Sequence, residues 1–246
     1  MNYRRIVDFL LIKFFAVISL FFLPASSFTF GMNSSRNDKL PAVVVDCCKK
    51  LGHNDKIKYL LIVDHSIDCK PSSAWAYFLK KREGKEWDLV FKDRAYVGKN
   101  GMGKTKEGDS KTPIGTFSII GAFGILDNPG TKLPYIEIKE TTYACDDKSE
   151  FYNKIIDIGE TKHDCKGERM LDYELPYRYG LMINYNHKCE YGLGSNIFVH
   201  CYGKYEYTGG CIALSPGKMV KLLTTIMSKE EAKLVVTDSS NVISNS

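Results

Sequence analysis

The sequence lacks the marks of several large protein classes. Its 246 residues carry a net charge of only +5, and the lysines and arginines are spread along the chain rather than clustered. Nucleic-acid binding is therefore not indicated, because it depends on a basic patch. No internal repeat or low-complexity linker divides the chain, and one segment alone has the pattern of a strong amphipathic helix. These absences leave a single domain built mainly from strands.

Short apolar runs bounded by turn residues make up most of the pattern. Residues 74–80 and 87–91 flank a glycine-containing turn and predict a β-hairpin. Further strands are predicted at 59–63, 95–98, 115–120, 135–139, 180–185, 195–200 and 233–237. We therefore predict a mainly β (β-rich α+β) fold, in which a closed or sandwiched sheet carries one packed C-terminal helix.

The predicted helix follows Ser215. This residue can cap the first turn, and Pro216 suits the turn itself because its fixed backbone angle is already helical. The apolar side chains that fall on one face are Met219, Val220, Leu222, Leu223, Ile226 and Met227.

The N-terminus has the pattern of an export signal. Arg4 and Arg5 precede an apolar run at 14–23, and small residues follow at the spacing that a signal peptidase prefers. We interpret residues 1–27 as a secretory signal peptide and expect the protein in the periplasm or cell envelope. The alternative is a retained membrane anchor, because much of this segment is apolar. Residues 28–56 are predicted to be a lead-in, 57–237 the catalytic domain and 238–246 a polar tail.

Export changes how the eight cysteines are interpreted. Disulfide bonds are expected outside the cytosol, although their pairing cannot be deduced from spacing. A charged insert at about 124–175 carries Cys145 and Cys165 and is too long for a simple hairpin loop. We expect this insert to be a lid or wall of the active-site cleft, which a bond between the two cysteines can staple. The alternative is two unpaired thiols.

Cys211 and His200 are the candidate catalytic residues. Cys211 follows Gly209 and Gly210, which allow close approach of a ligand and free two amide N–H groups near the sulfur. His200 ends an apolar strand eleven residues upstream and can take the thiol proton, leaving a thiolate. The alternative is a buried cysteine near a structural histidine. A zinc site that includes Cys201 fits no standard ligand spacing, so no metal and no cofactor are predicted.

Four segments carry a resemblance to a known family. Residues 98–101 and 107–117 resemble the first conserved block of the L,D-transpeptidase (YkuD-type) catalytic domain. Residues 194–200 and 208–211 resemble its active-site block. The segments between them resemble those of an exported bacterial branch of the family. The resemblance extends in order over about residues 57–227.

The resemblance implies an enzyme that acts on peptidoglycan. Such an enzyme opens a tetrapeptide stem between diaminopimelate and D-alanine through a cysteine nucleophile, and passes the acyl group to an amine of another stem or to water. It implies Cys211 as nucleophile, His200 as general base oriented by a backbone carbonyl, and the N–H groups of Gly210 and Cys211 as oxyanion donors. The possible substrate-binding residues are Thr208, Gly209, Tyr202 and Arg169.

The chain departs from the family pattern beside the nucleophile. Gly209 stands where the family commonly has histidine, and Ala213 stands where it has an arginine that can clamp a carboxylate. Arg169 and Arg178 are the candidates to replace that arginine. Two alternative functions stay open: an L,D-carboxypeptidase that uses water as acceptor, and an inert wall-binding module. An intact cysteine and histidine argue against the inert module.

Overall fold

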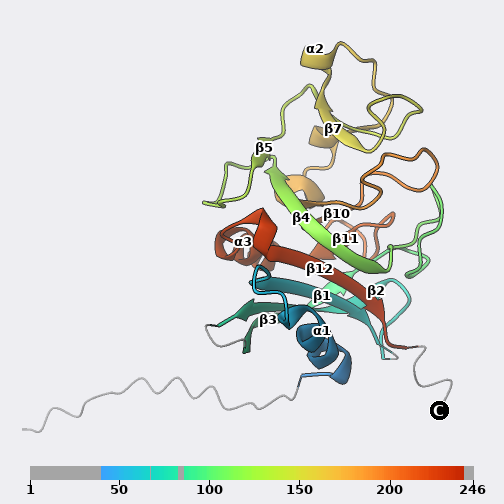
Figure 1. Ribbon diagram of the computed structural model, residues 1–246. Helices are drawn as coiled ribbons and strands as arrows, with labels where there is room; N and C mark the ends of the chain where they lie inside the picture. The colour runs from blue at the N-terminus through green and yellow to red at the C-terminus, as the bar shows by residue number, and fades with distance from the viewer. Residues whose placement is uncertain (1–39, 67, 83–85, 241–246) are drawn as a thin grey trace, which may run out of the picture. The chain divides into compact units, whose positions relative to one another are not determined.

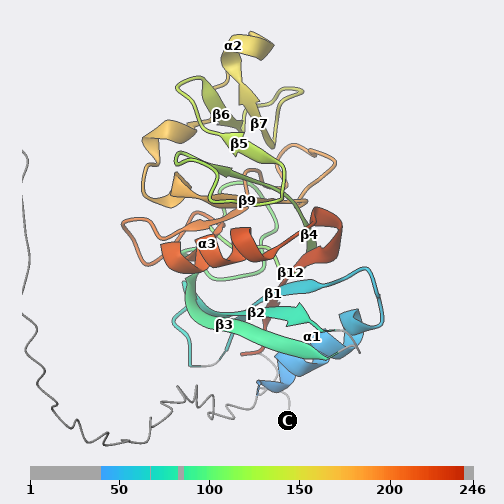
Figure 2. The same ribbon diagram turned by 90° about the vertical axis from the view of Figure 1, so that its left-hand side faces the viewer.

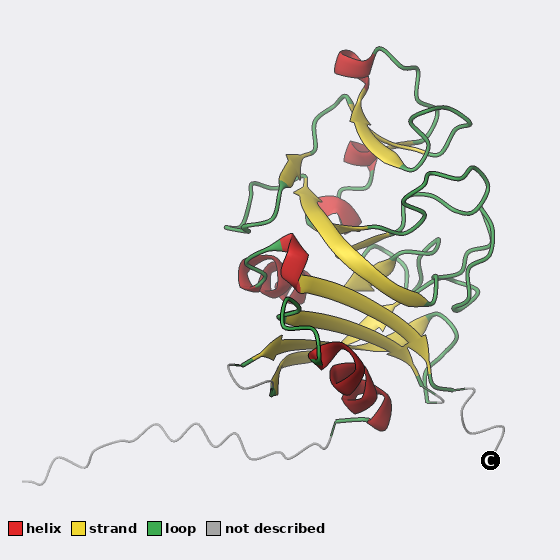
Figure 3. Ribbon diagram, in the orientation of Figure 1, coloured by secondary structure: helices red, strands yellow, loops and turns green. Residues whose placement is uncertain are grey.

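The computed structural model describes residues 40–66, 68–82 and 86–240. The predicted signal peptide, the first part of the lead-in and most of the polar tail lie outside the described residues. Within them, no helix is both long and apolar enough to cross a membrane. Strands predominate, as Figure 3 shows. The α-helices are α1 (Ala42–Gly52), α2 (Ile158–Thr161) and α3 (Pro216–Thr225). The short 3-10 helices are η1 (Met170–Asp172), η2 (Pro176–Arg178) and η3 (Lys229–Glu231).

The strands form one large sheet and one small sheet. The large sheet contains β1 (Tyr59–His65), β2 (Ser73–Lys81), β3 (Trp87–Tyr96), β4 (Gly115–Gly124), β5 (Tyr135–Glu137), β9 (Gly180–Ile183), β10 (Phe198–Cys201), β11 (Ile212–Leu214) and β12 (Ala232–Asp238). The small sheet contains β6 (Thr142–Cys145), β7 (Lys154–Asp157) and β8 (Glu168–Arg169).

The large sheet closes on itself. Its order is β12-β1-β2-β3-β11-β10-β9-β4-β5, and β12 also pairs with β4, so the strands from β12 to β4 form a ring. The predicted hairpin is confirmed as the antiparallel pair β2–β3. Residues 95–98 were predicted as a separate strand, but β3 runs through to Tyr96 without a break. The predicted closed, β-rich fold is confirmed.

Strand β1 is apolar throughout because both of its faces are covered. Leu61 and Val63 belong to the main core inside the ring, where α3 also packs. Leu60 and Ile62 point the other way and pack against α1. Successive side chains of a strand point to opposite faces, so a strand that is buried on both faces does not alternate between apolar and polar residues.

Helix α1 is a feature that the sequence analysis did not foresee. It lies in the segment predicted as a lead-in, and it belongs to the same compact unit as the barrel. Val44 and Cys48 are its buried residues and pack beside Tyr77 of β2. Consecutive valines have low helix propensity, and α1 buries only a narrow stripe, so its sequence signal is weak.

The predicted C-terminal helix is confirmed as α3, with two differences. Its buried residues are Met219, Leu222 and Leu223. The helix ends at Thr225, and Met227, predicted on the buried face, is 54% exposed. Ser215 occupies the N-cap position, but its hydroxyl donates a hydrogen bond of 2.6 Å to Asp93 instead of capping the helix.

The insert between β4 and β9 is a folded substructure. Strands β7, β6 and β8 pair in that order, and a disulfide bond joins Cys145 to Cys165. Figures 1 and 2 place this small sheet at the end of the barrel opposite α1. Tyr177, Phe198 and partly buried Cys211 belong to one hydrophobic cluster with Ala144 of β6. The insert therefore packs against the candidate active site.

Candidate active site

Cys211 and His200 line one cavity of about 550 Å³. Strands β10 and β11 run parallel, with Val199 opposite Ile212 and His200 opposite Ala213. Residues two apart on a strand share a face, so Cys211, Ala213 and His200 face the same side of adjacent strands. This register explains how an eleven-residue separation in sequence brings the two candidate residues to one cavity. It also places Ala213, which stands where the family has an arginine, beside His200.

The backbone of the preceding segment holds the Cys211 sulfur. The thiol donates to the carbonyl oxygen of Asn196 at 3.2 Å, and the Phe198 N–H donates to the sulfur at 3.3 Å. Asn196 adopts a left-handed backbone conformation with φ of 54°, which asparagine tolerates better than most residues. Asn196 and Phe198 therefore fix the position of the thiol.

His200 is held in a defined tautomer. Its Nδ1 lies 2.7 Å from the carbonyl oxygen of Cys201. A carbonyl only accepts, so Nδ1 carries the proton and Nε2 has a free lone pair. The ring of Tyr177 meets the imidazole edge-on, with ring centroids 5.7 Å apart. The family expectation that a backbone carbonyl orients this histidine matches the observed contact.

Both candidate groups are uncharged in the free protein. Burial raises the pKa of the Cys211 thiol to about 12, although the Phe198 hydrogen bond and the charge of Lys104 act in the opposite direction. Burial lowers the pKa of His200 to about 4, against the effect of the Cys201 carbonyl. The expected thiolate is therefore not the resting state. Proton transfer must accompany attack on a substrate.

Two threonines support the turn that carries the nucleophile. Thr208 and Thr112 donate to the Cys211 carbonyl oxygen at 2.6 and 3.2 Å. Gly98 donates its N–H to the Thr112 hydroxyl at 2.8 Å. The first conserved block therefore supports the turn at Cys211 through Thr112. Thr208, predicted as a possible substrate-binding residue, supports the same turn and also lines the cavity.

The two glycines before Cys211 differ. Gly210 has φ of 147°, and a side chain there would meet the Lys111 carbonyl oxygen at 2.9 Å, so glycine is required. Its N–H donates to the Thr208 hydroxyl at 3.1 Å, so the predicted oxyanion role of Gly210 requires this contact to be exchanged. Gly209 lines the cavity and has open space around it.

Carboxylates dominate the charged lining of the cavity. The acidic residues there are Glu107, Asp146, Glu168, Asp172 and Glu174. Glu168 accepts a hydrogen bond of 2.6 Å from Tyr177, and burial raises the pKa of the carboxyl, with Asp146 and Glu107 adding to the rise. A chain of contacts thus runs from Glu168 through Tyr177 to His200.

The predicted arginine and tyrosine contacts lie elsewhere. Arg169 donates to Asp172 at 2.8 Å, and the Tyr202 hydroxyl donates to the Arg94 carbonyl oxygen. Neither residue lines the cavity, and nor does Arg178. The lysines that line it are Lys104 and Lys204.

Lys104 is one of the site residues that sequence reasoning missed. It pairs with Asp109 at 2.9 Å, and both side chains are buried. Backbone N–H groups of Thr105, Lys106 and Lys111 also donate to this carboxylate, which holds its pKa well below the usual range. Lys104 lies between residues 98–101 and 107–117 of the first conserved block, but a lysine and an aspartate five residues apart in a loop have no distinctive pattern.

A second group of cysteine, aspartate and histidine lies in the insert. The ligand atoms of Cys145, Asp147 and His163 are within 4.8 Å of one another. The Cys145 sulfur is bonded to Cys165, so this group has no thiol to act as nucleophile. Among the described cysteines, only Cys211 joins a histidine in lining the large cavity.

Comparison with known protein families assigns most of the chain to one family. Residues 65–236 match the family model of the L,D-transpeptidase catalytic domain (YkuD). The match includes both conserved blocks, the insert and the strands on either side of the cavity. The search of curated proteins found no match for the chain.

Proposed function

The chain belongs to the L,D-transpeptidase catalytic domain family, and from this premise we propose that it is an exported cysteine acyltransferase of peptidoglycan stem peptides. The donor is a tetrapeptide stem and the acceptor is an amine of another stem. Cys211 is the nucleophile and His200 is the general base. The observation that carries the proposal is the cavity that Cys211 and His200 both line, with the Nδ1 of His200 held by the Cys201 carbonyl so that Nε2 has a lone pair.

Acylation begins from the neutral pair. Nε2 of His200 takes the thiol proton while the Cys211 sulfur attacks the stem carbonyl. The tetrahedral oxyanion is stabilised by backbone N–H groups at Gly210 and Cys211. As the C–N bond breaks, His200 returns the proton to the departing D-alanine amine. A thioester on Cys211 and a neutral His200 remain.

Transfer repeats these steps in reverse. The acceptor amine attacks the thioester carbonyl, and His200 takes a proton from it. The C–S bond then breaks, and the proton returns to the sulfur. Because the same histidine serves both halves, its low pKa keeps it available as a base at neutral pH.

The acidic lining supports an amine acceptor. An amine enters at neutral pH mostly as an ammonium ion, which carboxylates attract, and it loses one proton to solvent before its nitrogen attacks. An L,D-carboxypeptidase remains the alternative, since water can resolve the same thioester. An inert wall-binding module would have no need of the neutral, oriented Cys211–His200 pair.

Export is part of the proposal. It rests on the signal-like pattern at 1–27 and on the disulfide bond between Cys145 and Cys165, which persists in oxidising compartments.

The decisive experiment uses purified tetrapeptide muropeptides and mass analysis of the products. A crosslinked dimer with release of D-alanine supports acyl transfer, and a tripeptide stem alone supports the carboxypeptidase. Cys211→Ala is the control for the assigned nucleophile. Unchanged substrate with the unmodified protein would contradict both enzymatic functions.

A further inference from the structure

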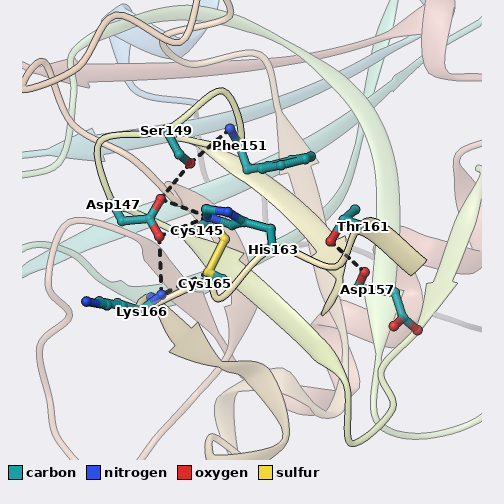
Figure 4. The surroundings of a disulfide bond; sticks show 10 residues. Cys145, Asp147, Ser149, Phe151, Asp157, Thr161, His163, Cys165 and Lys166 are labelled. Atoms are coloured by element: carbon teal, nitrogen blue, oxygen red, sulfur yellow. Dashed lines mark hydrogen bonds and ion pairs between the residues drawn. A yellow bond between two sulfur atoms is a disulfide. The ribbon is translucent and has the colours of Figure 1, made fainter. Parts of the chain in front are cut away.

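The disulfide in the insert lies beside an aspartate and a histidine, and Cys145, Asp147 and His163 form a group of possible metal ligands. Cys145 and Asp147 come from the end of β6, while His163 and Cys165 come from the segment after α2. Each pair is separated by one residue. Figure 4 shows the Asp147 carboxylate and the His163 imidazole beside the disulfide.

The distances suit one small ion. The ligand atoms of Cys145, Asp147 and His163 all lie within 4.8 Å of one another, and the Cys165 sulfur is bonded to that of Cys145. Tetrahedral zinc holds sulfur, nitrogen and oxygen ligands at about 2.0–2.3 Å, which separates them from each other by roughly 3.3–3.8 Å. Reduction frees both sulfurs, and the Cys165 sulfur, which lies outside this group of three, must then move toward the other ligands.

The surroundings orient and stabilise the ligands. The Asp147 carboxylate accepts hydrogen bonds from the Ser149 hydroxyl at 2.6 Å and the Lys166 N–H at 3.3 Å. The Gly167 N–H donates to the Cys165 sulfur at 3.4 Å, a contact that favours a thiolate. Such contacts from neighbouring groups are typical of metal centres.

The two cysteines are more deeply buried than the aspartate and the histidine. Cys145 is fully buried and Cys165 is 6% exposed, while the side chains of Asp147 and His163 are 20% and 23% exposed. The ring of His163 packs on Phe151, with centroids 4.8 Å apart, which limits its rotation. The sulfurs are shielded from solvent, while His163 Nε2 is paired with the Asp147 carboxylate at 3.0 Å, a contact that an entering metal ion must displace.

We propose that the reduced insert binds one zinc ion through Cys145, Asp147, His163 and Cys165. A dithiol reductant supplies two electrons and two protons, becomes a disulfide, and leaves two protein thiols. Zinc then displaces both thiol protons and is held by two thiolates, one imidazole and one carboxylate. Thiolate and imidazole ligands select zinc over magnesium or calcium. The insert thus has two alternative closures, a covalent bond when oxidised and a metal ion when reduced.

The test is a titration of the full chain with Co²⁺, a coloured probe for tetrahedral zinc sites. The reduced protein is expected to bind one equivalent, with sulfur-to-cobalt charge-transfer absorption that Zn²⁺ abolishes. The oxidised protein is expected to show no such absorption. Cys145→Ser and Cys165→Ser should abolish the absorption, and His163→Ala and Asp147→Asn should weaken binding at least about tenfold.

Two matched controls separate this site from other thiols. Cys211→Ser tests the active-site cavity, and Cys189→Ser tests the other His-x-Cys pair, at 187–189. Both variants should bind cobalt as the unmodified protein does. Absorption that survives in the Cys145 and Cys165 variants, or that disappears in Cys211→Ser, would overturn the proposal.

Alkylation of the unmodified protein provides a measurement that does not depend on folding of the variants. Zinc should slow labelling of Cys145 and Cys165 in the reduced chain at least tenfold, as read by peptide mass analysis. Equal labelling with and without zinc would also overturn the proposal.

Discussion

Cys211 is unusual because its sulfur is held by backbone groups and not by the histidine that we propose as its base. The thiol donates to Asn196, and the Phe198 N–H donates to the sulfur. With a neutral thiol and a neutral imidazole, the free protein is protected from indiscriminate reaction. Reactivity therefore depends on a bound substrate, which aligns the carbonyl as the proton leaves.

Replacing Cys211 with Ala should abolish covalent labelling and leave the fold intact, because alanine fits where the thiol lies. Intact-mass analysis with a donor stem or a carbapenem should show one adduct on the unmodified chain and none on the variant. Cys189→Ser is the matched control and should label normally. An adduct that persists on Cys211→Ala would move the nucleophile to another cysteine.

Replacing His200 with Ala should slow acylation by about two to four orders of magnitude, the usual contribution of a positioned base. In the unmodified protein, the base is lost only when His200 gains a proton. Its pKa of about 4 therefore predicts a constant rate near neutral pH and a fall as pH drops through about 4.

Pre-steady-state acylation from pH 3.5 to 8 measures this profile. The His200→Ala variant should be flat across the acid range. A rate that rises tenfold with each pH unit through neutrality would instead indicate that a thiolate forms before attack, contrary to the neutral pair.

Among the secondary-structure elements, the strands could be predicted from the sequence, but helix α1 could not. Tyr59–His65 is apolar along its whole length, and the hairpin had a clear turn. Helix α1 buries only Val44 and Cys48, so no broad apolar stripe was visible. The small sheet was missed because β8 has only two residues.

Val44→Ala should destabilise the protein, because Val44 is fully buried between α1 and the barrel. Loss of two methyl groups and the resulting cavity should cost about 2 kcal/mol. For a chain of this size, that corresponds to a decrease in Tm of about 4–8 °C, measured by thermal unfolding. Val45→Ala, at a half-buried position on the same helix, should have a smaller effect. Equal effects would show that α1 does not pack as described.

The disulfide-linked insert should influence the fate of the acyl group. The double variant Cys145→Ser, Cys165→Ser lacks the disulfide that closes a loop of 20 residues. By the chain-entropy model, this bond contributes about 3 kcal/mol to the free energy of unfolding. Asp146 and Glu168, which line the cavity, lie one residue after Cys145 and three residues after Cys165. We expect a higher ratio of hydrolysed to transferred product in metal-free buffer, measured by product mass analysis. Cys189→Ser should leave the ratio unchanged, and an unchanged ratio in the double variant would separate the insert from acceptor choice.

For the whole molecule, sequence and structure contributed differently to the site. Cys211 and His200 could be predicted as the catalytic pair, because Cys211 follows a Gly-Gly turn and His200 ends an apolar strand. The sequence did not predict the roles of Lys104 and Asn196 or the contact between Glu168 and Tyr177. These depend on how the loops are folded, which no local pattern specifies. The cavity's acidic character follows from side chains that are far apart in sequence.

Full-length protein expressed in a bacterium should fractionate with the periplasm or envelope, because residues 1–27 have the pattern of an export signal. Cell fractionation with mass analysis of the N-terminus measures both location and cleavage. A variant without residues 1–27 should stay in the cytosol. A full-length cytosolic form of the unmodified chain would contradict export and the expectation of an oxidising environment.

The pairing of β1 with β12 has a consequence for the order of folding. Residues 59–65 pair in parallel with residues 232–238, and β12 also joins β4 to close the ring. The barrel therefore cannot close until residues 232–238 have been synthesised. Contacts of such long range make folding slow. A nascent chain that stays unfolded for this long can bind chaperones. It also remains able to pass through a translocation pore until β12 has been synthesised.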